Sequence, residues 1–156
     1  MPPSDSADEA TQAVKAAVSP ASTAAPTTVP LPASSVISIG TTATAEHFAS
    51  GSNSYSAFKA AITNWTLGQA QVLGPKGIRC NVVSPGPIFI EGGDWDMVKT
   101  HMTPFYEATQ RSHPGGDLGV AQDVADAVAF LGSERARHIN GVNLTVDGGF
   151  LKRIDY

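Results

Sequence analysis

Between residues 36 and 83 the sequence passes from the pattern of a strand to that of a helix and then to that of a second strand. The run Val36-Ile37-Ser38-Ile39 is short and β-branched, which predicts a buried strand. Residues 78–83 have the same character and follow a long helical stretch. A strand–helix–strand unit of this size joins parallel strands, so it places the chain in the α/β class.

The helical stretch carries its own start and stop signals. Ser52 or Asn53 can accept hydrogen bonds from the first turn, and Gly74-Pro75 ends the helix. Gly77 marks the turn into the second strand, which stops at Ser84-Pro85-Gly86-Pro87. Side chains at intervals of three and four residues define one helix face: Tyr55, Phe58, Lys59, Ile62, Trp65 and Leu73.

Beyond residue 90 the patterns are shorter. We expect a helix that Asp94 caps and Pro104 kinks. Asp123 to Leu131 has helical spacing, and Val142 to Val146 alternates as a last strand that ends at Asp147-Gly148-Gly149. The expected architecture is a partial Rossmann-like sheet of about three parallel strands with three flanking helices.

The first part of the chain differs in composition from the rest. Residues 1–35 are mostly Ala, Ser, Thr and Pro. Within them Asp8 to Val18 favours a short helix that Pro20 stops, whereas Ser19 to Ser35 contains four prolines and predicts an extended or disordered linker. We therefore expect two parts, the Ala/Ser/Thr/Pro-rich segment and a packed domain at 36–156.

Charge and composition exclude several classes of partner. The net charge is -4 and the Lys and Arg residues are scattered, so no positive stripe is available for nucleic acid or an anionic membrane. No apolar segment is long enough to span a bilayer, and residues 1–10 lack a signal-peptide core. The single Cys80 favours a buried thiol and a cytoplasmic, reducing compartment. We expect no metal site, because no metal-ligand spacing relates His47, His101, His113 and His138.

Tyr55 and Lys59 have a chemical use in common. Four residues on a helix amount to about 400° of rotation and about 6 Å of rise, so both side chains project from one face. An ammonium beside a phenol favours the phenolate, and Tyr55 could then exchange a proton with a substrate carbonyl or alcohol. A hydroxyl from the loop after the first strand, from Thr41 or Thr42, could hold the substrate oxygen against the phenol. The same spacing is also common in surface pairs that have no function.

Four runs of sequence, in order and at suitable spacing, cover about three quarters of the chain: Ser54-Tyr55-Ser56-Ala57-Phe58-Lys59-Ala60-Ala61, Leu73 to Ile88, Asp123 to Leu131, and Ile139-Asn140-Gly141 with Val146-Asp147-Gly148-Gly149. They resemble the Tyr-x-x-x-Lys helix, the following strand with its Pro-Gly turn, and the last helix and strand of the short-chain dehydrogenase/reductase family. On this resemblance residues 36–156 are a truncated catalytic domain of that family.

The resemblance implies an NAD- or NADP-dependent oxidoreductase that acts on an alcohol or carbonyl group. Tyr55 would donate or accept the proton, with Thr41 or Thr42 in support. Lys59 would favour the phenolate and bond the nicotinamide ribose, and residues 91–106 would form a flap over the substrate. The backbone of the Pro-Gly turn would face the nicotinamide, and the cofactor-binding set is then Tyr55, Lys59, Pro85, Gly86 and Ile88.

The sequence also departs from the family pattern. A threonine stands where the family has a serine: counting back from Tyr55 reaches Thr42 without a gap and Thr41 with one. Residues 1–52 contain no Asn for the family's proton relay, and no Thr follows Ile88 directly. No Gly-x-x-x-Gly-x-Gly or Gly-x-Gly-x-x-Gly loop occurs anywhere to hold the pyrophosphate. We therefore expect the dinucleotide-binding half to be missing.

These departures leave three hypotheses open. The first is an oxidoreductase completed by a homo-oligomer or a complementing subunit, since in this family the Tyr-bearing helix and the last strand commonly form subunit contacts. The second is a cofactor-free isomerase, dehydratase or cyclase that uses the Tyr55–Lys59 pair. The third is a non-catalytic remnant. The substrate, and the choice between NAD and NADP, cannot be read from the residues present.

Overall fold

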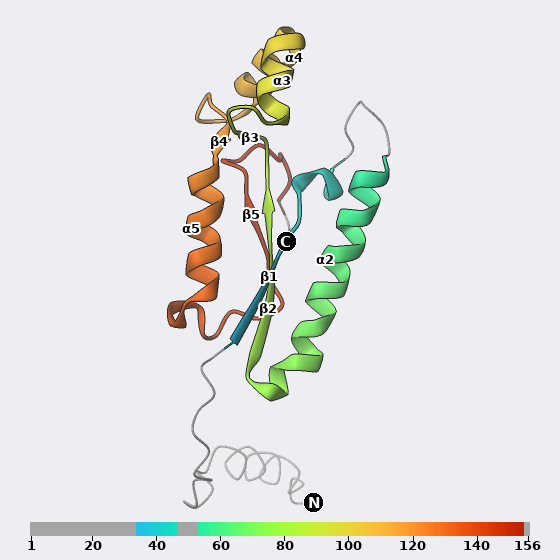
Figure 1. The fold of residues 1–156 in the computed structure, drawn as a ribbon, viewed down its shortest axis with the longest axis vertical. Helices are drawn as coiled ribbons and strands as arrows, with labels where there is room; N and C mark the ends of the chain where they lie inside the picture. The colour runs from blue at the N-terminus through green and yellow to red at the C-terminus, as the bar shows by residue number, and fades with distance from the viewer. Residues whose placement is uncertain (1–33, 47–52, 155–156) are drawn as a thin grey trace, which may run out of the picture.

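A computed structural model of the chain describes residues 34–46 and 53–154. Its centre is a parallel sheet of three strands in the order β1-β2-β5, formed by β1 (Ser34–Ile39), β2 (Ile78–Pro85) and β5 (Asn143–Val146). Helices α2 (Ser54–Leu73) and α5 (Ala121–Gly132) flank the sheet on opposite sides (Figure 1). The α/β class, the partial Rossmann-like sheet and its three parallel strands are confirmed.

Local signals fixed both ends of α2. The side chain of Asn53 accepts a hydrogen bond from the backbone N–H of Ser56 at 2.8 Å, so Asn53 rather than Ser52 is the cap that the structure describes. The helix ends at Leu73, where a 3-10 turn, η2 (Gly74–Lys76), begins. Gly77 closes that turn at φ 74°, a left-handed conformation that glycine adopts without steric cost.

The prediction for the region after β2 is wrong in two details. Gly93, not Asp94, is the cap residue of α3 (Asp94–His101), and Asp94 is the first residue of the helix. The expected kink at Pro104 is a complete break at Met102, so that a separate helix, α4 (Thr103–Ser112), follows. Proline near a helix start removes a donor that would have no partner there, so Pro104 starts a new helix.

A second, small parallel sheet was not predicted. It pairs β3 (Ile88–Phe89) with β4 (Gly119–Val120) and lies beside the α3–α4 pair (Figure 1). Each strand has only two residues, which is too short for a periodic signal in the sequence. With α3 and α4 separate, the described part of the chain has four α-helices where three were expected.

The core lies between α5 and the sheet. Val83 of β2, Leu131 of α5 and Ala136 are fully buried, and Ala136 ends the 3-10 turn η3 (Glu134–Ala136). Partly buried apolar side chains surround them: Ile37, Val124, Ala127, Val128, Ile139, Val142, Leu144 and Val146. Because these residues come from both ends of the described chain, packing of α5 holds the last strand next to β2.

Buried polar groups of β2 hold the loop between η3 and β5. The Asn81 side chain donates to the carbonyl of Ile139 and accepts from the N–H of Val142, each at 3.0 Å. The Asn140 side chain accepts from the N–H of Cys80 at 2.8 Å and donates to the carbonyl of Ala70 in α2. These bonds fix where β5 starts beside β2.

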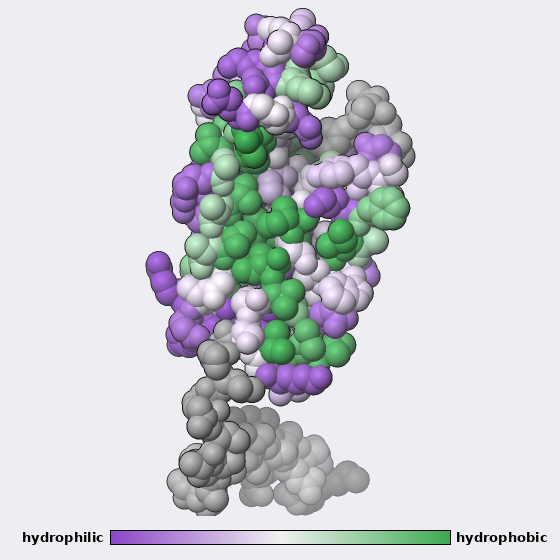
Figure 2. Space-filling view, in the orientation of Figure 1, coloured by the Kyte–Doolittle hydropathy of each residue, from purple (hydrophilic) through white to green (hydrophobic). Residues whose placement is uncertain are grey.

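Apolar side chains are exposed on both β1 and α2. β1 is an edge strand of the sheet, and its Val36 and Ile39 are exposed. Figure 2 shows hydrophobic residues gathered over the sheet between α5 and α2. Along α2 itself a set of large side chains is exposed: Phe58, Ile62, Trp65 and Val72.

The expectations for residues 1–33, the short helix and the linker, lie outside the described residues. No helix in the described part of the chain is both long and apolar enough to cross a membrane. In the same residues no three His, Cys, Asp or Glu side chains are grouped so that they could hold a metal ion.

The Cys80 thiol is expected to react only when the fold opens. Its side chain is 0% exposed, and burial raises the pKa of the thiol above its ordinary value. A thiol reagent such as Ellman's should therefore label the native protein far more slowly than the protein in denaturant. The raised pKa means that the folded protein favours the neutral thiol. The stability that the neutral thiol contributes is fully present below the unfolded-state pKa and is lost as the pH rises through the higher folded-state pKa. Rapid stoichiometric labelling at neutral pH would contradict this placement.

Candidate active site

The carboxyl ends of the parallel strands open into one large cavity. Its volume is about 1280 Å³, which exceeds the roughly 300–1,000 Å³ typical of small-ligand pockets. Ligands of open α/β sheets bind at this end of the strands, because the helix starts and loops gather there. The cavity is lined by all the predicted site residues: Thr41, Thr42, Tyr55, Lys59, Pro85, Gly86 and Ile88.

Tyr55 and Lys59 reach the cavity from the first two turns of α2. The Lys59 ammonium donates a hydrogen bond to the carbonyl of Ile39, the last residue of β1, at 2.8 Å. It also lies 5.8 Å from the centre of the Tyr55 ring. One ammonium proton is thus used to anchor the side chain, and Nζ has two further protons for a ligand. The Tyr55 side chain itself is 54% exposed, so its phenol is accessible.

The loop after β1 brings in both candidate threonines. Gly40 ends the strand and donates from its N–H to the carbonyl of Val83 at 2.7 Å. Thr41 then caps the 3-10 turn η1 (Thr42–Thr44), and its hydroxyl oxygen accepts from the N–H of Ala43 at 3.2 Å. Thr41 is half-buried, whereas Thr42 is 4% exposed. Both residues line the cavity, and Thr41 is the more exposed of the two.

Ser38 is placed in β1, as expected, and not in the loop. Its hydroxyl lies 2.7 Å from that of Thr66 on α2. This hydrogen bond fastens the helix to the strand, so Ser38 is a packing residue and does not replace the loop threonines.

The Pro85-Gly86-Pro87-Ile88 turn forms the cavity wall opposite α2. The Gly86 N–H donates to the carbonyl of Val146 at 2.9 Å, so that the turn continues the pairing of β2 with β5. A Cβ on Gly86 would lie 2.6 Å from Cβ and 3.0 Å from Cα of Asp147. The close approach that requires glycine at this position is therefore to Asp147, whatever ligand occupies the cavity.

Two side chains of the C-terminal segment line the cavity without having been predicted, Phe150 and Lys152. Asp147 accepts hydrogen bonds from the N–H groups of Gly149 and Leu151, which turns the chain back over the site. Lys152 donates to the carbonyls of Ser112 and Gly149 at 2.6 and 2.8 Å. No local pattern could have found these residues, because their position depends on the end of α4.

Residues 91–106, which the sequence predicts as a flap, contain α3 and the start of α4. Ile90, Trp95 and Phe105 line the cavity from this side. Trp95 lies on the first turn of α3 and Phe105 on the first turn of α4.

The donors in the cavity fit one end of a dinucleotide. Two cationic or phenolic donors, Lys59 and Tyr55, suit a ribose diol, and the apolar turn at Pro85 to Ile88 suits a flat ring. Neither a Gly-x-x-x-Gly-x-Gly nor a Gly-x-Gly-x-x-Gly motif, the patterns that hold a dinucleotide diphosphate, occurs in residues 34–46 and 53–154. The donor set of the cavity therefore suits a ribose beside a flat ring, without a dinucleotide motif for a diphosphate.

The family described as enoyl-(acyl carrier protein) reductase matches residues 6–151, nearly the whole chain. The chain belongs to the short-chain dehydrogenase/reductase family. The match begins well before Val36, where the resemblance in the sequence began. The curated relatives agree: isoepoxydon dehydrogenase of Aspergillus clavatus is 38% identical over 104 residues, and 3-oxoacyl-(acyl-carrier-protein) reductase of Escherichia coli is 39% identical over 104 residues.

This short-chain dehydrogenase/reductase chain spans about 40% of the length of the two curated relatives. The alignments cover 67% of this chain for the dehydrogenase and 64% for the reductase. Solved structures show the same relation. An oxidoreductase of this family from Burkholderia thailandensis superimposes with a TM-score of 0.66 and 32% identity, over 76% of this chain and 45% of that one. A short-chain dehydrogenase from Burkholderia cenocepacia, solved in complex with NADP, superimposes with a TM-score of 0.65 and 34% identity. The superposition covers 74% of this chain and 45% of that one.

Proposed function

We propose that this protein is an oxidoreductase that interconverts a small alcohol and the corresponding carbonyl compound, with Tyr55 as the acid–base catalyst. The observation that carries the proposal is the convergence of Tyr55, Lys59 and Thr41 on one cavity at the carboxyl ends of the strands. NAD or NADP is the cofactor that the family would use, bound with its nicotinamide end against Lys59 and the Pro-Gly turn.

The side chains divide the proton chemistry among themselves. In the direction of reduction the Tyr55 phenol gives its proton to the carbonyl oxygen as negative charge develops there. The Lys59 ammonium, anchored on the Ile39 carbonyl, stabilises the phenolate that remains. The Thr41 hydroxyl donates to the same substrate oxygen and fixes its position. A bound nicotinamide cofactor supplies the hydride in this direction and accepts it in the other.

We assign the family's serine role to Thr41 rather than to Thr42. The Thr41 oxygen already accepts from Ala43, so its own proton is directed to another acceptor, and the residue is half-buried at the cavity. Thr42 is almost wholly buried. A threonine keeps the hydroxyl and adds a methyl group, which narrows the space around the substrate oxygen.

We also propose that the protein works as an assembly, either of its own copies or with a complementing subunit. The exposed apolar side chains of α2 and the exposed Val36 and Ile39 on the edge strand β1 support association. The buried free thiol of Cys80 is compatible with the reducing environment of the cytoplasm, which we propose as its location.

A cofactor-free acid–base enzyme is the second candidate. It is favoured by one observation, that neither glycine-rich dinucleotide motif occurs in the described residues. Such an enzyme would use the Tyr55–Lys59 pair to enolise, dehydrate or cyclise a carbonyl compound.

Binding of the nicotinamide half separates the two candidates. We expect NADH, NADPH and reduced nicotinamide mononucleotide to bind the full chain at up to millimolar concentration, measured by nucleotide fluorescence. AMP should not compete, because in this proposal the cavity takes the nicotinamide end alone. Lys59→Met should weaken binding by about 10-fold, the value of one hydrogen bond to a charged group.

One control variant and one contradicting outcome complete this test. Lys76→Met removes a lysine from the exposed turn η2, far along the chain from the site, and should leave nucleotide affinity unchanged. If none of the three reduced nucleotides binds at millimolar concentration, alone or with added cell extract as a source of a subunit, the oxidoreductase is excluded and the cofactor-free enzyme becomes the better proposal.

A further inference from the structure

One side of the cavity is an aromatic wall made by Trp95 and Phe105. Their rings are nearly parallel, with centroids 6.0 Å apart and an angle of 13° between the planes. Both residues line the cavity that Tyr55 also lines. Two helices supply one ring each, so the wall exists only because the chain breaks at Met102 and starts α4.

The aromatic wall is supported from behind by side chains that do not line the cavity. The Tyr106 ring lies 6.4 Å from Trp95 and 6.4 Å from Phe89 of β3. The Lys99 ammonium lies 5.0 Å from the centre of the Phe89 ring and 5.6 Å from that of Tyr106. Edge-to-face and cation–π contacts of this kind fix the relative position of α3, α4 and β3.

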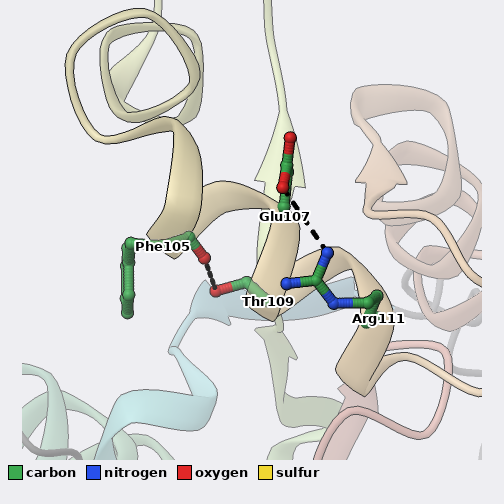
Figure 3. A network of polar contacts seen from close by, with 4 residues as sticks. All are labelled: Phe105, Glu107, Thr109 and Arg111. Carbon is green, nitrogen blue, oxygen red and sulfur yellow. Dashed lines mark hydrogen bonds and ion pairs between the residues drawn. The ribbon is translucent and has the colours of Figure 1, made fainter.

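Helix α4 also turns its charged groups away from the cavity. Figure 3 shows the Phe105 ring on one side of α4 and the Glu107–Arg111 ion pair, at 3.5 Å, on another. The Thr109 hydroxyl donates to the Phe105 carbonyl at 2.9 Å and so satisfies its own polar group within the helix. Neither Glu107 nor Arg111 lines the cavity.

The charged side chains that line the cavity balance, with Glu46 and Asp94 against Lys59 and Lys152, so the cavity has no excess charge that would select an ion. Asp94, next to Trp95 in the chain, lines the cavity. Lys59 donates to the Ile39 carbonyl and Lys152 to two carbonyls, which fixes both ammonium groups at the cavity. An apolar aromatic surface that is left open, with Phe105 53% exposed, is typical of a ligand-binding site.

We propose that the substrate carries a neutral, planar aromatic or conjugated ring system, which stacks on Trp95 and Phe105 while its carbonyl or hydroxyl oxygen reaches Tyr55. This inference rests on the proposed function for the identity of the reacting group. The stacking site itself is independent of it, because no group of the Tyr55–Lys59 pair contributes to the wall. Linear acyl compounds are disfavoured, because they have no ring to stack on the wall.

Direct binding in the absence of nucleotide tests the wall. The probe is 1-tetralone, a bicyclic aryl ketone, and the comparison compound is cyclohexanone, which has the same functional group without the aromatic ring. In the full chain carrying Trp65→Phe, Trp95 is the one remaining tryptophan, and its fluorescence should be quenched saturably by 1-tetralone and not by cyclohexanone.

Substitutions in the wall should weaken this binding by defined amounts. Trp95→Leu and Phe105→Leu should each reduce affinity for 1-tetralone by about 2- to 10-fold, measured by calorimetry, because each removes one aromatic contact. Trp95→Phe keeps a ring, so its affinity for 1-tetralone should stay within about 2-fold of that of the parent. Phe130→Leu removes an exposed ring of α5 that does not line the cavity, and should have no effect.

The outcomes separate this inference from the proposed function. Equal affinity for the two ketones, or an unchanged affinity in both leucine variants with native circular dichroism, overturns the stacking site. Tyr55-dependent reduction of a linear ketone without 1-tetralone binding also overturns it, although the proposed function stands. Ring-dependent binding without any turnover supports the stacking site and counts against the proposed function.

Discussion

Replacing Tyr55 by Phe is expected to lower kcat for reduction of a carbonyl substrate by about 10²- to 10⁴-fold, the usual contribution of a positioned general acid. The change removes the phenolic hydroxyl and leaves the ring. Because the side chain is exposed at the cavity, the free energy of unfolding should change by less than about 0.5 kcal/mol. The measurement is the oxidation of NADPH or NADH followed by absorbance, with any complementing subunit present at a fixed ratio.

Nucleotide affinity serves as the control for Tyr55→Phe. Lys59 and the Pro-Gly turn provide most of the proposed contacts to the cofactor, so reduced nucleotide should bind the variant within about 10-fold of the parent, the most that loss of one hydrogen bond from Tyr55 would cost. A variant that binds nucleotide and keeps its full turnover would remove Tyr55 from the mechanism. A loss of both binding and turnover would make Tyr55 a cofactor contact and leave the acid–base role unsupported.

Replacing Asn81 by Ala is expected to lower the free energy of unfolding by about 2 to 4 kcal/mol. The Asn81 side chain is fully buried, and its loss leaves the N–H of Val142 without that acceptor and the carbonyl of Ile139 with only its longer bond from Arg79, at 3.3 Å. A buried polar group that loses its partner costs about 1 to 3 kcal/mol. Urea unfolding followed by tryptophan fluorescence measures the change.

Asn64→Ala is the matched control for Asn81→Ala. Asn64 lies on α2 and is exposed, so the free energy of unfolding of Asn64→Ala should stay within about 0.5 kcal/mol of the parent value. A loss below about 1 kcal/mol for Asn81→Ala would show that the loop before β5 does not depend on these bonds. In that case the packing of Leu131 and Val83 would be the main support of the last strand.

The exposed surfaces bear on how these measurements should be made. An edge strand with exposed Val36 and Ile39, together with exposed apolar side chains on α2, favours association between chains. Stability and turnover should therefore be compared at one protein concentration, because association stabilises the folded state by mass action.

The sequence by itself determined the elements whose signals lie within a few residues. The β-branched run at 36–39 defines a strand, and a cap at Ser52 or Asn53 with the Gly74-Pro75 stop defines a helix. The four-residue spacing of Tyr55 and Lys59 places both on one face of that helix. Caps, breakers and periodicity act through local backbone geometry, so they are readable without knowledge of the fold.

The tertiary structure alone decided the features that depend on distant segments meeting. The β3–β4 pair, the break at Met102 that sets Trp95 against Phe105, and the return of Lys152 over α4 have no local signal. The same holds for Gly86, whose neighbour Asp147 lies far along the chain. Such contacts are fixed by the packing of whole elements, which short-range propensities do not encode.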